Sequence, residues 1–161
     1  MHETLDVIRR VLLAILLIGL VGTTTELLLL KHDEGPYQLI PLVLIGLAFV
    51  AIGWHAVDRG TASLRLFRIT MVLFIAAGLL GMYLHYRANV EFQHEVDPAV
   101  AGRELLVKAM TAKTPPALAP GSMSQLGLIG LAYAYRYPVR RRNAANTARA
   151  TLRRSTSGED A

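Results

Sequence analysis

"VLLAILLIGLVGTTTELLLL", residues 11–30, decides the fold because it is long and apolar enough to cross a membrane as one helix. At 1.5 Å per residue it would span about 30 Å, the thickness of the hydrocarbon core of a bilayer. Three further stretches have a similar length and polarity. We therefore predict four transmembrane helices, at residues 11–30, 37–57, 66–86 and 118–135.

The composition also favours a membrane. Hydrophobic residues make up 53% of the 161 residues and the mean hydropathy is +0.38, whereas soluble domains contain roughly 45–50% apolar residues. So short a chain has too few polar residues to cover four apolar segments in water. We predict an all-α integral membrane four-helix bundle over residues 1–138. The first apolar run lacks a small-residue cleavage site, so we expect it to remain as an anchor.

Basic residues near the ends of the spans predict the orientation. Of the 17 Lys and Arg residues, twelve fall on the side of the two termini, and five fall on the other side among acidic residues. Aromatic residues gather at both predicted interfaces, which supports the same boundaries. We expect a multi-pass protein of the bacterial inner membrane with both termini in the cytoplasm.

The outer segment between the third and fourth spans, residues 87–117, is expected to contain a short amphipathic helix. Asp97 followed by Pro98 is typical of an N-cap and a first helical position, opening "PAVAGRELLVKAMTA". Apolar residues fall largely on one face of this helix. It would lie on the outer membrane surface or over the bundle.

The tail, residues 139–161, is basic and rich in small residues, and we expect it to be disordered in the cytoplasm. Arg140, Arg141 and Arg142 follow the fourth span directly and suit anionic lipid headgroups. No aromatic residue follows Tyr137 that could stack on a base, so we expect no nucleic-acid partner.

Small residues should allow the helices to pack closely, since in lipid there is no hydrophobic driving force for their association. Some could instead face a partner subunit. The residues concerned are Gly19, Gly22, Gly46, Gly53, Gly78, Gly81, Gly121, Gly127 and Gly130.

Glu26 is an acidic residue close to the outer end of the first span, where an isolated carboxylate costs free energy unless it has partners. Polar residues of the other spans fall at a similar depth. We predict an outer-half polar cluster that either ties the helices together or binds a cation or a polar headgroup. Its members would be Glu26, Thr23, Gln38, His85, Ser122 and Gln125.

Histidines on the outer side raise a second possibility, a metal or haem site. His32 and His85 could approach each other as axial ligands of a b-type haem. With acidic neighbours they could hold zinc or another divalent ion; the candidate ligands are His32, His85, Glu91, His94 and Glu95. Hydrogen bonds to loop backbone or water explain these histidines more simply, so we predict no cofactor. The absence of cysteine excludes thiolate sites and c-type haem attachment.

Three stretches, "GTTTELLLLKHDEGPYQLIP" (22–41), "HYRANVEFQHEVDP" (85–98) and "PPALAPGSMSQLGLIGLAYAYRYP" (115–138), resemble a family of small bacterial four-helix inner-membrane proteins of no known activity. The resemblance covers nearly the whole chain except the basic tail. It implies the same topology and transfers no site residue.

Two classes of function remain open. The chain shows no P-loop, nucleophile elbow, dinucleotide fingerprint or metalloprotease motif, which favours a non-enzymatic role. We expect a membrane accessory or scaffold subunit of a larger complex, for example in electron transport, with lipid and protein partners. The alternative is a small binding or transport protein for an ion, a metal or a lipid-like ligand, which would use the polar cluster around Glu26.

Overall fold

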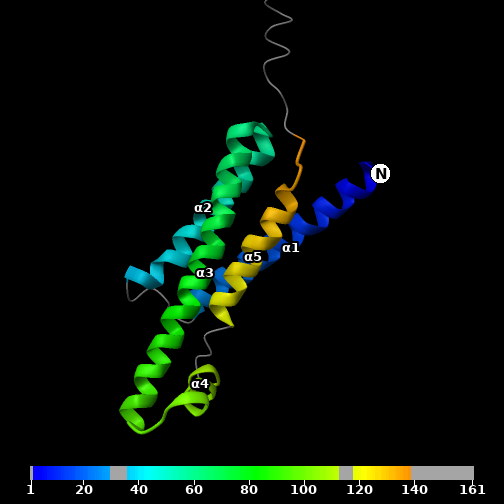
Figure 1. The fold of residues 1–161 in the computed structure, drawn as a ribbon. Helices are drawn as coiled ribbons and strands as arrows, with labels where there is room; N and C mark the ends of the chain where they lie inside the picture. The colour runs from blue at the N-terminus through cyan, green and yellow to red at the C-terminus, as the bar shows by residue number, and fades with distance from the viewer. Residues whose placement is uncertain (1, 30–35, 113–117, 139–161) are drawn as a thin grey trace, which may run out of the picture.

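The computed structural model describes residues 2–29, 36–112 and 118–138 of the chain. This part is all-α (Figure 1). Its helices are α1 (His2–Leu29), α2 (Pro36–Asp58), α3 (Thr61–Val96), α4 (Gly102–Met110) and α5 (Ala119–Ala134).

Three of these helices, α1, α2 and α3, are long and apolar enough to cross a membrane, which is consistent with a membrane protein. The predicted fourth span corresponds to α5, which has 16 residues. At 1.5 Å per residue this helix is about 24 Å long, less than the roughly 30 Å hydrocarbon core. The all-α class and three helices that could span a membrane are confirmed for the described residues, and a four-helix membrane bundle stays a prediction.

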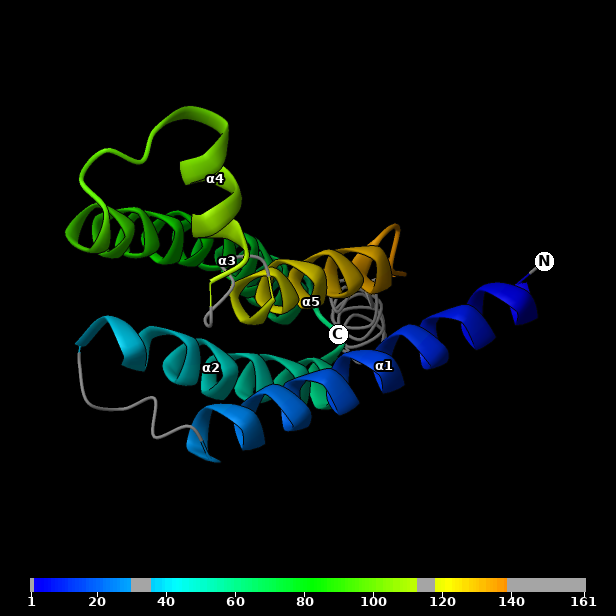
Figure 2. The same ribbon diagram turned by 90° about the horizontal axis from the view of Figure 1, so that it is seen from below.

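The helices form two layers, with α1 beside α2 and α5 beside α3 (Figure 2). The closest packing joins α3 to α5, and α2 also packs against α3. Between the layers lies one apolar core, whose fully covered side chains include Leu16, Leu20, Phe67, Met71 and Phe74.

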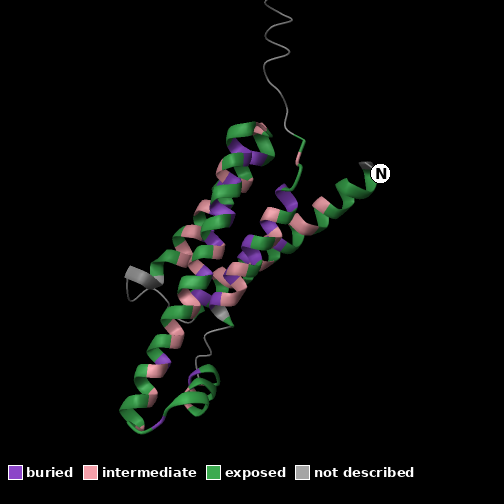
Figure 3. Cartoon of the chain, viewed as in Figure 1, coloured by how far each residue is buried: buried purple, intermediate pink, exposed green. Residues whose placement is uncertain are grey.

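Most residues of the long helices are not buried within the chain (Figure 3). In the most apolar 18-residue windows of α1, α2 and α3, only 17%, 22% and 28% of the residues are buried within the chain. A helix that is apolar all round yet mostly uncovered needs an apolar surrounding, which a bilayer supplies.

Glycines allow the tight contact between α3 and α5. A Cβ built on Gly127 would lie 2.6 Å from the Met71 carbonyl oxygen, and one on Gly78 would lie 2.6 Å from the Pro120 carbonyl oxygen. The Ser124 hydroxyl of α5 donates to the Ile75 carbonyl of α3 at 3.2 Å. Internal packing by glycine is thus confirmed at this interface.

A sharp turn joins α2 to α3. It contains Arg59 and Gly60, and Arg59 has a positive φ of 39°. The turn places the last residues of α2 beside the first residues of α3. We call this end of the bundle the α2–α3 end.

At the opposite end, α3 is longer than predicted and continues through Val96. The predicted N-cap at Asp97 is wrong, because Asp97 follows α3 and its carboxylate accepts a hydrogen bond from the Ala99 backbone N–H at 3.1 Å. The amphipathic helix begins later, at Gly102, whose φ of +58° favours glycine.

Helix α4 folds back onto the last turns of α3. The buried Asn89 side chain donates to the Ala109 carbonyl at 3.0 Å, which satisfies a carbonyl at the C-terminal end of α4. Lys108 pairs with Glu104 at 2.7 Å and with Asp97 at 4.0 Å. The hydrogen bond with Glu104 raises the pKa of the Lys108 ammonium group. The end of α3 and α4 therefore form a small helical hairpin.

Candidate functional site

Two of the polar residues near the end of α1 form hydrogen bonds within their own helix. The Thr24 and Thr25 hydroxyls donate to carbonyls of their own helix, to Leu20 at 2.7 Å and to Val21 at 2.9 Å. Thr23 is half-buried, whereas Glu26 is exposed. The carboxylate therefore lies on the outward side of α1.

The remaining members of the predicted polar cluster lie on three other helices. His85 on α3 and Ser122 on α5 are half-buried, whereas Gln125 on α5 is exposed. Gln38 belongs to the first turn of α2. A cluster that brings these residues to Glu26 stays a prediction.

The predicted metal ligands on the last turns of α3 face solvent. Glu91 accepts from the Arg87 guanidinium at 2.8 Å, and His94 and Glu95 are exposed. In the ranges 2–29, 36–112 and 118–138, no group of three or more His, Asp or Glu side chains could hold a metal ion. His32 lies outside the described residues, and so does any haem or metal site that includes it. Arg140, Arg141 and Arg142 also lie outside them.

A buried polar site not anticipated from the sequence lies at the α2–α3 end. It consists of His55, Ser63, Phe67, Tyr133 and Tyr137, and we call it the His55 cluster. His55 is only 2% exposed and Ser63 is fully covered. The cluster joins the last turns of α2, the first turns of α3 and the end of α5 together with the residues that follow it.

The hydrogen bonds of the His55 cluster define the tautomer of His55. The Ser63 hydroxyl donates to the Gly60 carbonyl at 3.1 Å, so its proton is already used. The His55 Nδ1 atom lies 3.2 Å from the Ser63 Oγ and must therefore be the donor. The Nε2 atom is then an acceptor, and it has no hydrogen-bond partner within the described part of the chain.

This arrangement opposes nucleophilic catalysis by Ser63. A serine nucleophile needs its hydroxyl to donate to an adjacent base. Here the hydroxyl donates to a backbone carbonyl and the imidazole donates to the serine, which is the reverse direction. Both side chains are also closed off from solvent. We conclude that this pair joins α2 to α3.

Aromatic rings enclose the His55 imidazole. The Tyr137 ring meets it edge-on with centroids 4.7 Å apart, the Tyr133 ring lies edge-on at 6.3 Å, and Phe67 stacks at 6.4 Å. Edge contacts of this kind are favourable because the positive rim of one ring meets the negative face of another. Tyr133 lies in the last turn of α5 and Tyr137 follows the helix, and both contact the same ring.

Two arginines form hydrogen bonds that attach the C-terminal end of α5 and the residues after it to α1 and α3. Arg9 of α1 donates to the Arg136 carbonyl at 3.0 Å, and its guanidinium lies 5.4 Å from the centre of the Tyr137 ring. Arg68 of α3 donates to the Ala134 carbonyl at 2.7 Å. Cations suit the last carbonyls of a helix, which carry the negative end of its dipole.

His55 was not predicted as a site residue, because no second histidine lies at its depth in the sequence. The signal that could have identified it is the short turn, which brings "WHAVD" (54–58) next to "TASLRLF" (61–67), together with the tyrosines at 133 and 137. A histidine facing a serine across such a turn indicates a contact between helices.

No protein-family model, no curated protein and no solved structure matches this chain. The resemblance to small four-helix membrane proteins stays an expectation.

Proposed function

We propose that this protein is a non-catalytic integral membrane subunit that packs against a transmembrane helix of a partner protein through the outward face of α2. The observation that carries the proposal concerns Gly46 and Gly53. A Cβ built on either residue would meet no atom within 4 Å. Gly78 and Gly81 on α3 and Gly127 and Gly130 on α5 serve close contacts within the chain, whereas Gly46 and Gly53 face outward.

The face of α2 around these glycines is continuous. At about 100° per residue, Gly46, Gly53 and Val57 fall within about 40° of one another on the helix. The covered residues Ile45, Ala48 and Ala51 lie on other sides. In lipid, small residues allow two helices to approach closely, so an unused glycine face favours a helix as its occupant.

Helix α1 supports the same function by an independent feature. Gly22 is open in the same way, and Glu26, one turn later, is exposed. Glu26 lies three residues before the end of α1, about 4.5 Å along its axis. A carboxylate facing lipid costs free energy, and a donor on a neighbouring protein would remove that cost. The alternative function, a ligand site around Glu26, needs the carboxylate to face inward, so its exposure favours the subunit.

Photo-crosslinking from α2 tests the proposal. A benzophenone amino acid placed at Val50, which is 63% exposed beside Gly46 and Gly53, should join this protein to one other membrane protein in intact membranes. The adduct should disappear when Gly46 and Gly53 are both replaced by isoleucine, because added side chains hold the partner helix away. The partner should also copurify in a fixed stoichiometry in mild detergent.

Val72 on α3 provides the matched control, since it is a valine of a long helix that is 53% exposed on another face. The same probe there should give no such adduct. An adduct of twice the mass of this chain would indicate that the protein forms a homo-oligomer and is not an accessory subunit. Equal adducts from both positions, or none that depends on the glycines, would contradict the proposal.

We further propose that α1, α2, α3 and α5 all cross the bacterial inner membrane and that both termini are cytoplasmic. A reporter inserted after Asp97, between α3 and α4, should then report the outer side. Reporters after Gly60 and after Pro138 should report the cytoplasm, because each follows an even number of spans. An outer-side signal after Pro138 would mean that α5 does not cross.

A further inference from the structure

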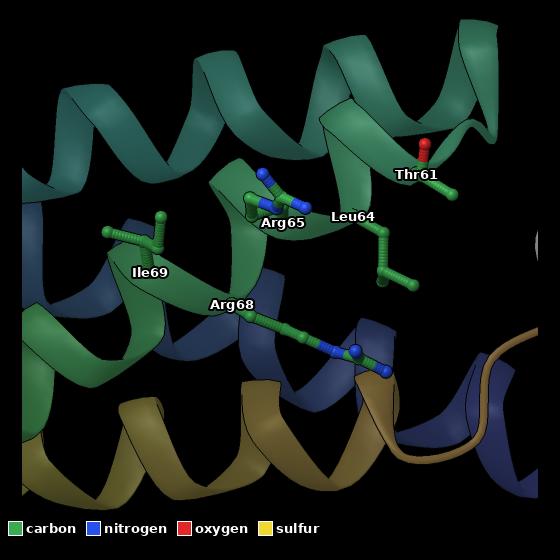
Figure 4. Close-up of a pocket in the computed structure, with 5 residues that line it drawn as sticks. All are labelled: Thr61, Leu64, Arg65, Arg68 and Ile69. Atoms are coloured by element: carbon green, nitrogen blue, oxygen red, sulfur yellow. The ribbon is translucent and has the colours of Figure 1, made fainter.

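An open hollow of about 280 Å³ lies on the first turns of α3, at the α2–α3 end (Figure 4). Its lining residues are Thr61, Leu64, Arg65, Arg68 and Ile69. The hollow therefore combines two guanidinium groups, one hydroxyl and aliphatic side chains. Such a set suits a ligand with an anionic group and an apolar part.

Both arginines of the hollow are exposed residues of α3. Arg68 donates a hydrogen bond to the Ala134 carbonyl, and Figure 4 shows its side chain extending toward the end of α5. A guanidinium has five N–H donors, so Arg68 keeps donors for an anion while it holds α5.

Below the arginines, the outward side of α3 is apolar. Ile69 is 51% exposed, Val72 is 53% exposed and Leu79 is 56% exposed, and the run ends at Tyr83, which is 58% exposed. From Arg65 to Tyr83 is 18 residues along one helix, about 27 Å. This length matches a hydrocarbon core bounded by a basic residue and a tyrosine.

We propose that the hollow binds the headgroup of an anionic phospholipid. Arg65 and Arg68 contact the phosphate oxygens, since a guanidinium matches phosphate geometry with paired donors. Thr61 donates to a headgroup oxygen, and the acyl chains follow Ile69 and Val72. A soluble anion would use the arginines but would gain nothing from the apolar run. The proposal rests on insertion of α3 in a membrane and is independent of any partner at α2.

Because Arg68 also holds the Ala134 carbonyl, lipid binding and the attachment of α5 share one side chain. An anion beside Arg68 would hold that guanidinium in place over the end of α5. Bound anionic lipid should therefore stabilise the packing of α5 on α3.

Native mass spectrometry of the full chain in detergent tests the site, with dioleoyl phosphatidylglycerol as the probe. Arg65→Gln should weaken binding at least about fivefold, because each basic residue near a membrane surface contributes about that factor. Arg65 is the better test residue, since replacing Arg68 would also free α5. The control is Arg10→Gln, an exposed arginine of α1, which should leave binding unchanged.

Three results would overturn the proposal. Equal weakening by Arg10→Gln would show attraction by overall charge. Equal binding of dioleoyl phosphatidylcholine would show that the arginines do not select the headgroup. Full displacement of the lipid by an equal concentration of glycerol 1-phosphate would assign the hollow to a soluble anion. These results would leave the crosslinks from α2 and the reporter signals unaffected.

Discussion

Replacing Gly127 with alanine should detach α5 from α3. The added Cβ would lie 2.6 Å from the Met71 carbonyl oxygen and 3.1 Å from the Ile75 backbone nitrogen. Both are main-chain atoms of a long helix, so no side-chain rotation relieves the contact and the helices must separate. We expect a loss at or above the upper end of the roughly 1–3 kcal/mol typical of overpacking. The unfolding midpoint of the detergent-solubilised protein, followed by circular dichroism, measures it.

Gly121→Ala is the matched control on the same helix. A Cβ at Gly121 would meet nothing within 4 Å, so the substitution should be neutral or slightly stabilising, because alanine has the higher helix propensity. The two substitutions add the same methyl group and should have different effects. A Gly127→Ala protein as stable as the parent would contradict the described contact between α3 and α5.

Hydropathy predicted the positions of the long helices but not all of their ends. The apolar run of α3 stops near Tyr86, yet the helix continues to Val96 because no proline or glycine interrupts "YRANVEFQHEV" (86–96). Loss of hydropathy indicates where a helix leaves the membrane and does not indicate where hydrogen bonding ends. The same distinction explains Asp97. Its preference for helix starts is shared with turns, and here it follows a helix.

The sequence predicted that glycines would allow close packing, but it did not show which glycines pack within the chain and which face outward. Gly127 and Gly46 look alike in the sequence, since each occupies the middle of an apolar run. Only the packing of the helices decides that a Cβ at Gly127 would meet the Met71 carbonyl oxygen while one at Gly46 would meet no atom within 4 Å. The division into used and unused glycines, which supports the proposed partner face, therefore needed the structure.

The surroundings of the polar residues also could not be predicted from the sequence alone. Glu26 was identifiable from the cost of a carboxylate in an apolar run, but its outward direction depends on which side of α1 meets α5. His55 was harder to identify, because its partners come from two separate segments, the start of α3 and the end of α5. Nothing local to residue 55 indicates that Tyr133 and Tyr137 enclose its ring.

The His55 cluster leads to the second large effect. His55→Ala should cost about 2–4 kcal/mol, because it removes a covered ring and leaves a cavity among Phe67, Tyr133 and Tyr137. His55→Phe should remain within about 1.5 kcal/mol of the parent. It keeps most of the ring volume and loses one hydrogen bond to Ser63, but it also removes the Nε2 atom that has no partner among the described residues. Unfolding midpoints of the two variants in the same detergent measure both effects.

Ser63→Ala separates the hydrogen bond from the ring. It leaves the His55 Nδ1–H buried without its acceptor, which should cost about 1–3 kcal/mol, so this variant should be less stable than His55→Phe although it removes fewer atoms. If His55→Phe is instead as unstable as His55→Ala, the Nε2 atom has a partner outside the described residues, and the imidazole then does more than fill space. If all three variants match the parent, the α2–α3 end does not depend on this cluster, and the attachment of α5 rests on Arg9 and Arg68, whose guanidiniums bind the last carbonyls of that segment.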